Sequence, residues 1–170
     1  PPAELFRDPI AVAYAAAQRG ECCRVHFGAL SQLGAIIWSG AIFIPLFAAG
    51  ILYARRYPAR VWQCMTAAGI LTAILIIDEV YQGHEIVYRK LTGLPESAIF
   101  AGYAVLVLAY LVFFRREILR VGPGLLMVSV AAFAFSLVTD KFVSESVAWH
   151  RVGEDGSKLI GIWAWTGFHW

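Results

Sequence analysis

The chain has 170 residues, of which 59% are hydrophobic and only 15% are charged. Soluble domains carry about 25% charged residues, so this composition argues against a soluble domain and is typical of a multi-pass membrane protein. The formal net charge of +2 provides no broad basic surface for nucleic acid.

Apolar windows alternate with short polar segments along most of the chain. A helix needs about 20 apolar residues to cross a hydrocarbon core of ~30 Å. The windows that meet this length cover residues 29–54, 61–81, 97–114 and 121–139. The sequence therefore predicts an all-α fold, a polytopic transmembrane helical bundle with four spans.

The two ends of the chain are predicted to differ from this bundle. Residues 158–170 form a fifth apolar segment that is too short to span as given, so we expect a short or truncated helix or an interfacial one. Residues 1–28 are interrupted by charges and are predicted to form an N-terminal surface segment. Residues 29–170 then form the transmembrane helical bundle.

Arginines mark two of the connections between the windows. The segments 55–60 and 115–120 share the pattern RRxxxR followed by valine. If four spans alternate in direction, both connections lie on one side of the membrane, and the positive-inside rule makes that side cytoplasmic. We expect a bacterial inner (plasma) membrane protein with its N-terminus outside.

The cysteines predict neither a disulfide framework nor a zinc site. Cys22 and Cys23 are neighbours, and Cys64 lies within the second apolar window. Neighbouring cysteines rarely pair with each other, and none of the spacings matches a zinc motif.

The stretch IIDEVYQGHE at residues 76–85 places several ionisable groups at the end of the second window. Asp78 lies 17 residues after Val61, and Asp140 lies 19 residues after Val121. At 1.5 Å per residue these separations are ~26 Å and ~28 Å, so both carboxylates are predicted near the outer boundary. Lys158 begins the fifth segment on that same side, and we expect the three residues to share one level.

The helical faces divide this stretch if the second helix continues beyond Tyr81. Asp78, Gln82 and Glu85 then form one polar stripe, while His84 lies on a neighbouring aromatic face. A carboxylate that faces lipid is costly, so the polar stripe is expected to face other helices or water.

Several interpretations of these groups stay open. The first is a structural ion-pair cluster formed by Asp78, Glu85, Asp140, Glu154, Asp155 and Lys158. The second is a metal or catalytic site formed by Asp78, His84, Glu85 and Asp140. Carboxylates with an imidazole suit divalent cations that can activate water, although no E-x-x-H or H-E-x-x-H motif is present. A proton or cation path, and a haem or chlorin bound by interfacial histidines, are further alternatives. The residues identify no particular cofactor.

Tryptophans gather near the end of the chain. They are Trp149, Trp163, Trp165 and Trp170. Such residues anchor helices at the membrane interface, and they are also enriched where proteins contact one another. We therefore expect this group to contact lipid or a partner.

Together, IIDEVYQGHE, Asp140 and the segment EDGSKLIGI at residues 154–162 resemble a group of small bacterial multi-pass membrane proteins. The resemblance covers roughly residues 30–165. It implies a topology but no activity, because none is known for that group. The membrane hydrolases that include alkaline ceramidases carry several zinc-binding histidines on late helices, and these histidines have no counterpart in this sequence.

The leading functional prediction is a non-enzymatic accessory subunit in the lipid bilayer. It would pack against protein partners in a larger inner-membrane assembly, for example an energy-transducing one, with the outer-face cluster as a structural latch. The alternative is a metal-dependent membrane enzyme acting on a lipid or another substrate at the outer face.

Overall fold

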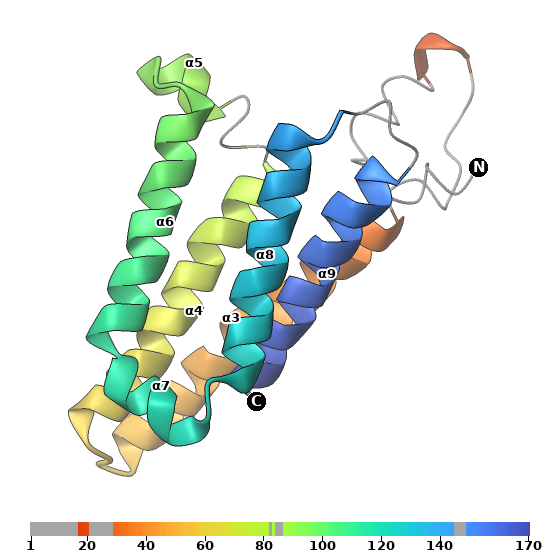
Figure 1. Cartoon of the computed structure of the whole chain (residues 1–170). Coiled ribbons are helices and arrows are strands. Elements are labelled where there is room, and N and C mark those ends of the chain that lie inside the picture. The colour runs from red at the N-terminus through yellow and green to blue at the C-terminus, as the bar shows by residue number, and fades with distance from the viewer. Residues whose placement is uncertain (1–16, 21–28, 82, 84–86, 145–148) are drawn as a thin grey trace. The chain divides into compact units, whose positions relative to one another are not determined.

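A computed structural model describes residues 17–20, 29–81, 83, 87–144 and 149–170. Its helices are α3 (Ala29–Ala54), α4 (Ala59–Val80), α5 (Tyr88–Thr92), α6 (Glu96–Phe113), α7 (Arg115–Val121), α8 (Gly124–Phe142) and α9 (His150–Phe168) (Figure 1). This part of the chain contains no strand, so the prediction of an all-α fold is confirmed.

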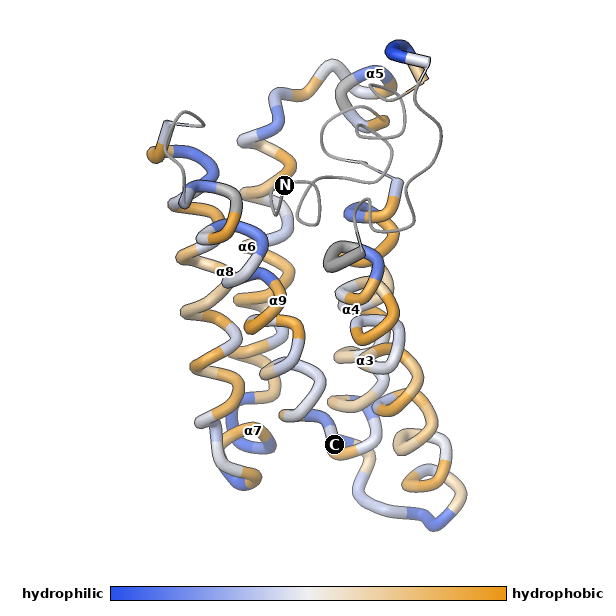
Figure 2. The backbone as a smooth tube through the Cα atoms, turned by 90° about the vertical axis from the view of Figure 1, so that its right-hand side faces the viewer, coloured by the Kyte–Doolittle hydropathy of each residue, from blue (hydrophilic) through white to orange (hydrophobic). Residues whose placement is uncertain are grey.

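Within the described ranges, four helices are long and apolar enough to cross a membrane. These candidate spans are Gln32–Ala54, Ala59–Val80, Glu96–Phe113 and Gly124–Phe142. They coincide with the four apolar windows of the sequence, and Figure 2 shows apolar residues along the helices with hydrophilic ones mainly near their ends. The composition of each window was enough to locate it.

Some boundaries differ from the predicted ones. α8 begins at Gly124, directly after Pro123, rather than at Val121. α4 ends at Val80 and is capped by Tyr81. Gln82, His84 and Glu85, whose predicted faces depend on whether the helix continues, lie outside the described residues.

The helix that contains the predicted fifth segment, α9, begins well before the apolar residues of that segment. α9 has 19 residues and begins at His150, eight residues before Lys158. Its first half, HRVGEDGSK, is polar, which is why hydropathy alone missed it. A helix of 19 residues is ~28 Å long at 1.5 Å per residue, which matches the length of α8.

The chain forms two compact units, and each is described by itself. The first contains residues up to Ile37 together with Gly124–Phe168, and the second contains Trp38–Pro123 with His169–Trp170. α3 contributes its first residues to one unit and the remainder to the other.

In the first unit, α8 and α9 form an antiparallel hairpin with close contact along its length. A Cβ built on Gly153 would lie 3.6 Å from Thr139, and one on Gly161 would lie 3.2 Å from the Phe133 ring. A Cβ on Gly167 would meet Leu125 at 3.4 Å. Small residues thus bring the two backbones together, as in membrane helix pairs generally.

In the second unit, α4 packs against α3, α6 and α7. Gly69 of α4 lies against α3, because a Cβ there would be 2.8 Å from Leu46 Cδ2 and 3.1 Å from the carbonyl oxygen of Ile42. The contacts between α4 and α6 run through long side chains, which are described below.

The division into an N-terminal surface segment, residues 1–28, and a transmembrane bundle, residues 29–170, stays a prediction. Of the N-terminal segment the structure describes only residues 17–20, which are exposed. His26, Cys22 and Cys23 lie outside this range.

Candidate functional site

Asp78 is the best-defined residue of the predicted cluster. It lies in the last turn of α4 and is only 5% exposed. Tyr103 of α6 interacts with Asp78 and with Tyr88 of α5. The site therefore joins side chains from three helices of one unit.

Gly83, in the segment that follows α4, packs against Asp78 and Tyr88. It is buried, and a Cβ at this position would overlap Oδ1 of Asp78 and lie 2.8 Å from Cε2 of Tyr88. Any side chain here would displace the carboxylate or the tyrosine ring. Glycine is therefore required for the backbone to pass this close to Asp78.

A carboxylate inside an apolar bundle is costly unless hydrogen bonds satisfy it. The Tyr103 hydroxyl interacts with Asp78, and a polar group in this place offsets part of that cost. Chemically, this arrangement fixes the carboxylate and ties α6 to the end of α4. It suits a structural contact more directly than a reaction with a diffusing substrate.

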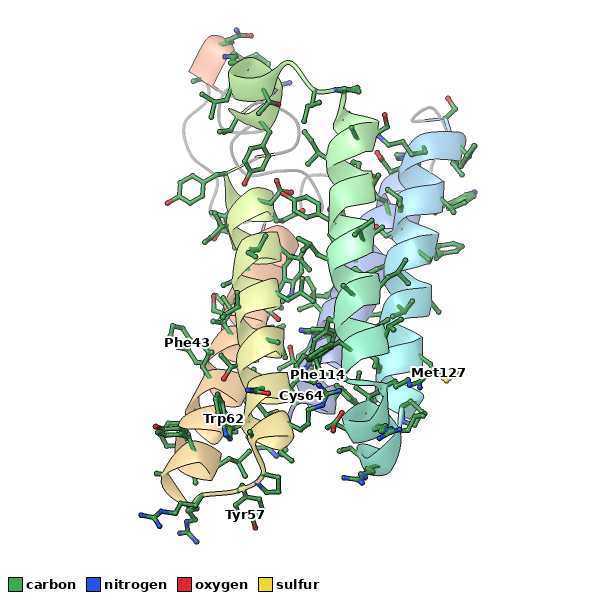
Figure 3. The ribbon with its side chains drawn as sticks, turned by 90° about the vertical axis from the view of Figure 1, so that its left-hand side faces the viewer. Phe43, Tyr57, Trp62, Cys64, Phe114 and Met127 are labelled. Atoms are coloured by element: carbon green, nitrogen blue, oxygen red, sulfur yellow. The ribbon has the colours of Figure 1, made fainter. Side chains whose placement is uncertain are left out.

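A second polar group lies at the other end of α4. The Cys64 sulfur is 3.6 Å from the Tyr110 hydroxyl, which is 3.5 Å from Nε2 of His169. All three residues are buried, with exposures of 5–6%. Figure 3 shows Cys64 on the side of α4 that faces α6, near Phe114 at the start of α7. Burial leaves this thiol shielded from solvent reagents.

Arg60 links the start of α4 to the α6–α7 junction. Its guanidinium donates to the Phe113 carbonyl oxygen at 3.0 Å and lies 4.3 Å from the centre of the Phe113 ring. Its Nε is 3.9 Å from Oε1 of Glu117. In the part of the chain that the structure describes, Oε2 of Glu117 is buried without a hydrogen bond.

Four further residues of the predicted ion-pair cluster, Asp140, Glu154, Asp155 and Lys158, belong to the first unit, and Glu85 lies outside the described residues. Asp140 is exposed and lies 3.2 Å from Lys141, its neighbour in sequence. Glu154 Oε2 lies 3.9 Å from Nδ1 of His150, one turn earlier on α9. Asp155 and Lys158 are half-buried on the same helix.

The predicted meeting of Asp78 with Asp140 and Lys158 would join the two units, and it stays a prediction. The predicted metal site also stays a prediction, because His84 and Glu85 lie outside the described ranges. Among the residues that the structure describes, no three histidine, cysteine or acidic side chains gather closely enough to hold a metal ion.

The four tryptophans occupy different environments. Trp149, Trp163 and Trp170 are 51%, 59% and 93% exposed, whereas Trp165 is 6% exposed. The exposed three are available to lipid or a partner, and Trp165 packs within the fold.

Tyr103 and Tyr110 were not singled out from the sequence, although a signal was present. After Ser97 they are the only side chains of α6 that carry a hydrogen-bonding group, and they are seven residues apart. That spacing places both on one face of the helix. An otherwise apolar span with two hydroxyls on one face predicts that this face points toward protein.

The sequence places His150 in an outer loop beside Trp149, yet its side chain is only 4% exposed. Within the described residues neither of its ring nitrogens makes a hydrogen bond. Its sequence neighbours gave no sign of this burial.

Comparison with known proteins gives one match. A family model described as a domain of unknown function (DUF8692) matches residues 1–170, the whole chain. No curated protein and no solved structure matches it.

Proposed function

The chain belongs to the DUF8692 family over its whole length, and since that family description names no activity, we propose a function from the fold: a non-enzymatic membrane subunit. The subunit packs against partner proteins in a larger assembly of the bacterial inner membrane. Its arginine-rich connections, residues 55–60 and 115–120, face the cytoplasm.

The surroundings of Asp78 support a structural rather than a catalytic role for that residue. The carboxylate is buried and is engaged by Tyr103, with Gly83 packed against it. A latch of this kind holds α6 against α4 without needing access to a substrate. Of the residues in the predicted outer-face latch, Asp78 is the one whose contact with α6 lies within the second unit.

The observation that carries the proposal is the outward face of α6. Only 6% of this candidate span is buried, compared with 39% of α4. Opposite its tyrosines, α6 exposes Ala98, Gly102, Val105, Ala109 and Val112. Their spacing of four, three, four and three residues follows the seam of a left-handed helix pair.

The exposed face of α3 gives a contrast within the same unit. Phe43, Phe47 and Ile51 are 69%, 74% and 44% exposed, and Figure 3 shows Phe43 pointing away from the helices. Bulky side chains suit contact with lipid, whereas small residues let another helix approach closely. We therefore assign the α6 face to a transmembrane helix of a partner protein and the α3 face to lipid.

Site-specific photo-crosslinking in native membranes tests this assignment. A photoreactive residue at Ala109 or Val105 is expected to give discrete protein adducts that mass spectrometry can identify. The same residue at Phe47 serves as the matched control and is expected to give lipid adducts only. Crosslinking reports proximity directly and does not depend on knowing the partner in advance.

A substitution separates partner binding from folding. A Cβ at Gly102 meets no atom within 4 Å, so Gly102→Leu is expected to leave the melting temperature in detergent unchanged. It should nevertheless abolish the protein adduct, because leucine fills the seam. Adducts at Phe47 as abundant as those at Ala109, or adducts only with a second copy of the chain, would contradict the proposal.

A further inference from the structure

Two arginine-rich segments that are far apart in sequence meet at one end of the second unit. Arg60 is the last residue of the first segment. Its guanidinium donates to the Phe113 carbonyl oxygen at 3.0 Å, just before the second segment, and lies 3.9 Å from Glu117 within it. The segments 55–60 and 115–120 together hold six arginines and one acidic residue, Glu117. Arg60 lies nearest that acid, so the charge of the other arginines remains in excess.

These other arginines are open to the surroundings. Every one of them is exposed: Arg55, Arg56, Arg115, Arg116 and Arg120. Arg55 and Arg56 directly follow the end of the candidate span α3 at Ala54, and the other three lie on α7, the short helix after the end of α6 at Phe113. The guanidinium groups therefore sit where a span ends, at the level expected for lipid headgroups.

The backbone at Arg56 is unusual for its residue type. Tyr57 N bonds to the Leu52 carbonyl and Arg56 N to the Tyr53 carbonyl, which is the Schellman motif that ends many helices. Arg56 occupies the left-handed position of this motif with φ of 56°. Glycine is strongly favoured there because a side chain strains the backbone. An arginine in this strained conformation leads us to look for a use of its charge.

α7 adds apolar surface beside the charges. Ile118 is 5% exposed and anchors the helix, while Leu119 and Val121 are 65% and 69% exposed. Tyr57, next to Arg56, is 54% exposed. Arginines mixed with exposed Leu, Val and Tyr at the end of a span suit the interface of a bilayer, where acyl chains and headgroups meet. A soluble anion would need only the charges.

We propose that Arg55, Arg56, Arg115, Arg116 and Arg120 form a binding surface for the phosphate headgroups of anionic phospholipids. Arg60 acts as a positioning residue that holds the two segments together. The guanidinium groups bind lipid phosphates in two-pronged hydrogen bonds, and Leu119 and Val121 contact the acyl chains.

Native mass spectrometry of the detergent-purified protein tests this proposal, with phosphatidylglycerol and phosphatidylcholine as the two probes. The wild type is expected to bind phosphatidylglycerol more tightly. Each arginine near an anionic surface contributes on the order of fivefold, so Arg55→Gln with Arg56→Gln should weaken that binding about 25-fold. Arg115→Gln with Arg116→Gln should do the same.

The matched control is Arg89→Gln with Lys90→Gln on α5, which removes the same charge outside the proposed surface. It is expected to bind phosphatidylglycerol as the wild type does. Arg56→Gly relieves the strained backbone, so it should raise the melting temperature while still weakening lipid binding. That variant keeps the test valid if the glutamine variants fold poorly.

Three outcomes would overturn the proposal. The first is an equal loss of phosphatidylglycerol binding in the Arg89 and Lys90 control, which would show that binding depends on the net charge of the protein and not on this surface. The second is phosphatidylcholine bound as tightly as phosphatidylglycerol. The third is inorganic phosphate competing at the same concentration as the lipid, which would make this a site for a free anion.

Discussion

The α8–α9 pair and the α4–α6 pair are held together in different ways. α8 and α9 meet along their length through Gly153, Gly161 and Gly167, and Ser129 donates to the Gly161 carbonyl oxygen at 2.9 Å. α6 instead meets α4 at three separate places, through Tyr103 at Asp78, Tyr110 at Cys64 and Phe113 at Arg60. One pair relies on close backbones and the other on long polar side chains.

The difference matters because lipid supplies no hydrophobic force that would press two helices together. Continuous van der Waals contact, as between α8 and α9, is lost as a whole when one residue is enlarged. Isolated hydrogen bonds can be removed one at a time, each at modest cost. The second arrangement also leaves most of the α6 surface uncovered, and that surface is where we place a partner.

Gly161→Val should have the largest effect on stability. The added methyl groups would meet the Phe133 ring, already 3.2 Å from an ideal Cβ, and would separate α8 from α9. We expect a loss of about 2–3 kcal/mol, typical of overpacking at a close contact. Reversible unfolding in mixed micelles, followed by circular dichroism, measures it.

Gly156→Val is the control on the same helix. A Cβ at Gly156 meets no atom within 4 Å, so we expect a change within about 0.5 kcal/mol. Equal losses in the two variants would show that valine disturbs α9 itself rather than its contact with α8.

Substitutions in the contact between Asp78 and Tyr103 should have an intermediate effect on stability. Asp78→Asn and Tyr103→Phe are each expected to cost about 1–2 kcal/mol, because Asp78→Asn replaces a charged acceptor with a neutral amide and Tyr103→Phe removes the hydroxyl. The double variant should be no less stable than either single variant. Strict additivity in the same unfolding experiment would mean that the two side chains act independently, and the latch would have to be abandoned.

Ser129→Ala should have the smallest effect. It removes one hydrogen bond to a carbonyl oxygen while the glycine contacts remain. Hydrogen bonds between membrane helices contribute about 0.6 kcal/mol on average, and we expect a loss of that size. A loss larger than that of Asp78→Asn would reverse the comparison, because polar bonding would then dominate the α8–α9 pair as well.

The amino-acid sequence by itself determined the candidate spans and the level of the acidic residues along them. An apolar window of about 20 residues is a local property, so α3 had the bounds expected from composition. Asp78 was also correctly expected near the end of its helix, and it lies two residues before Val80. These features depend only on helix rise and hydropathy.

The tertiary structure decided which polar groups meet. Tyr103 reaches Asp78, Tyr110 lies between Cys64 and His169, and Arg60 joins two arginine-rich segments. It also decided that α9 begins at His150, where a polar first half is stabilised by packing on α8 rather than by its own hydropathy. Such pairings depend on how separate helices rotate and approach one another, and no single segment of the sequence contains that information.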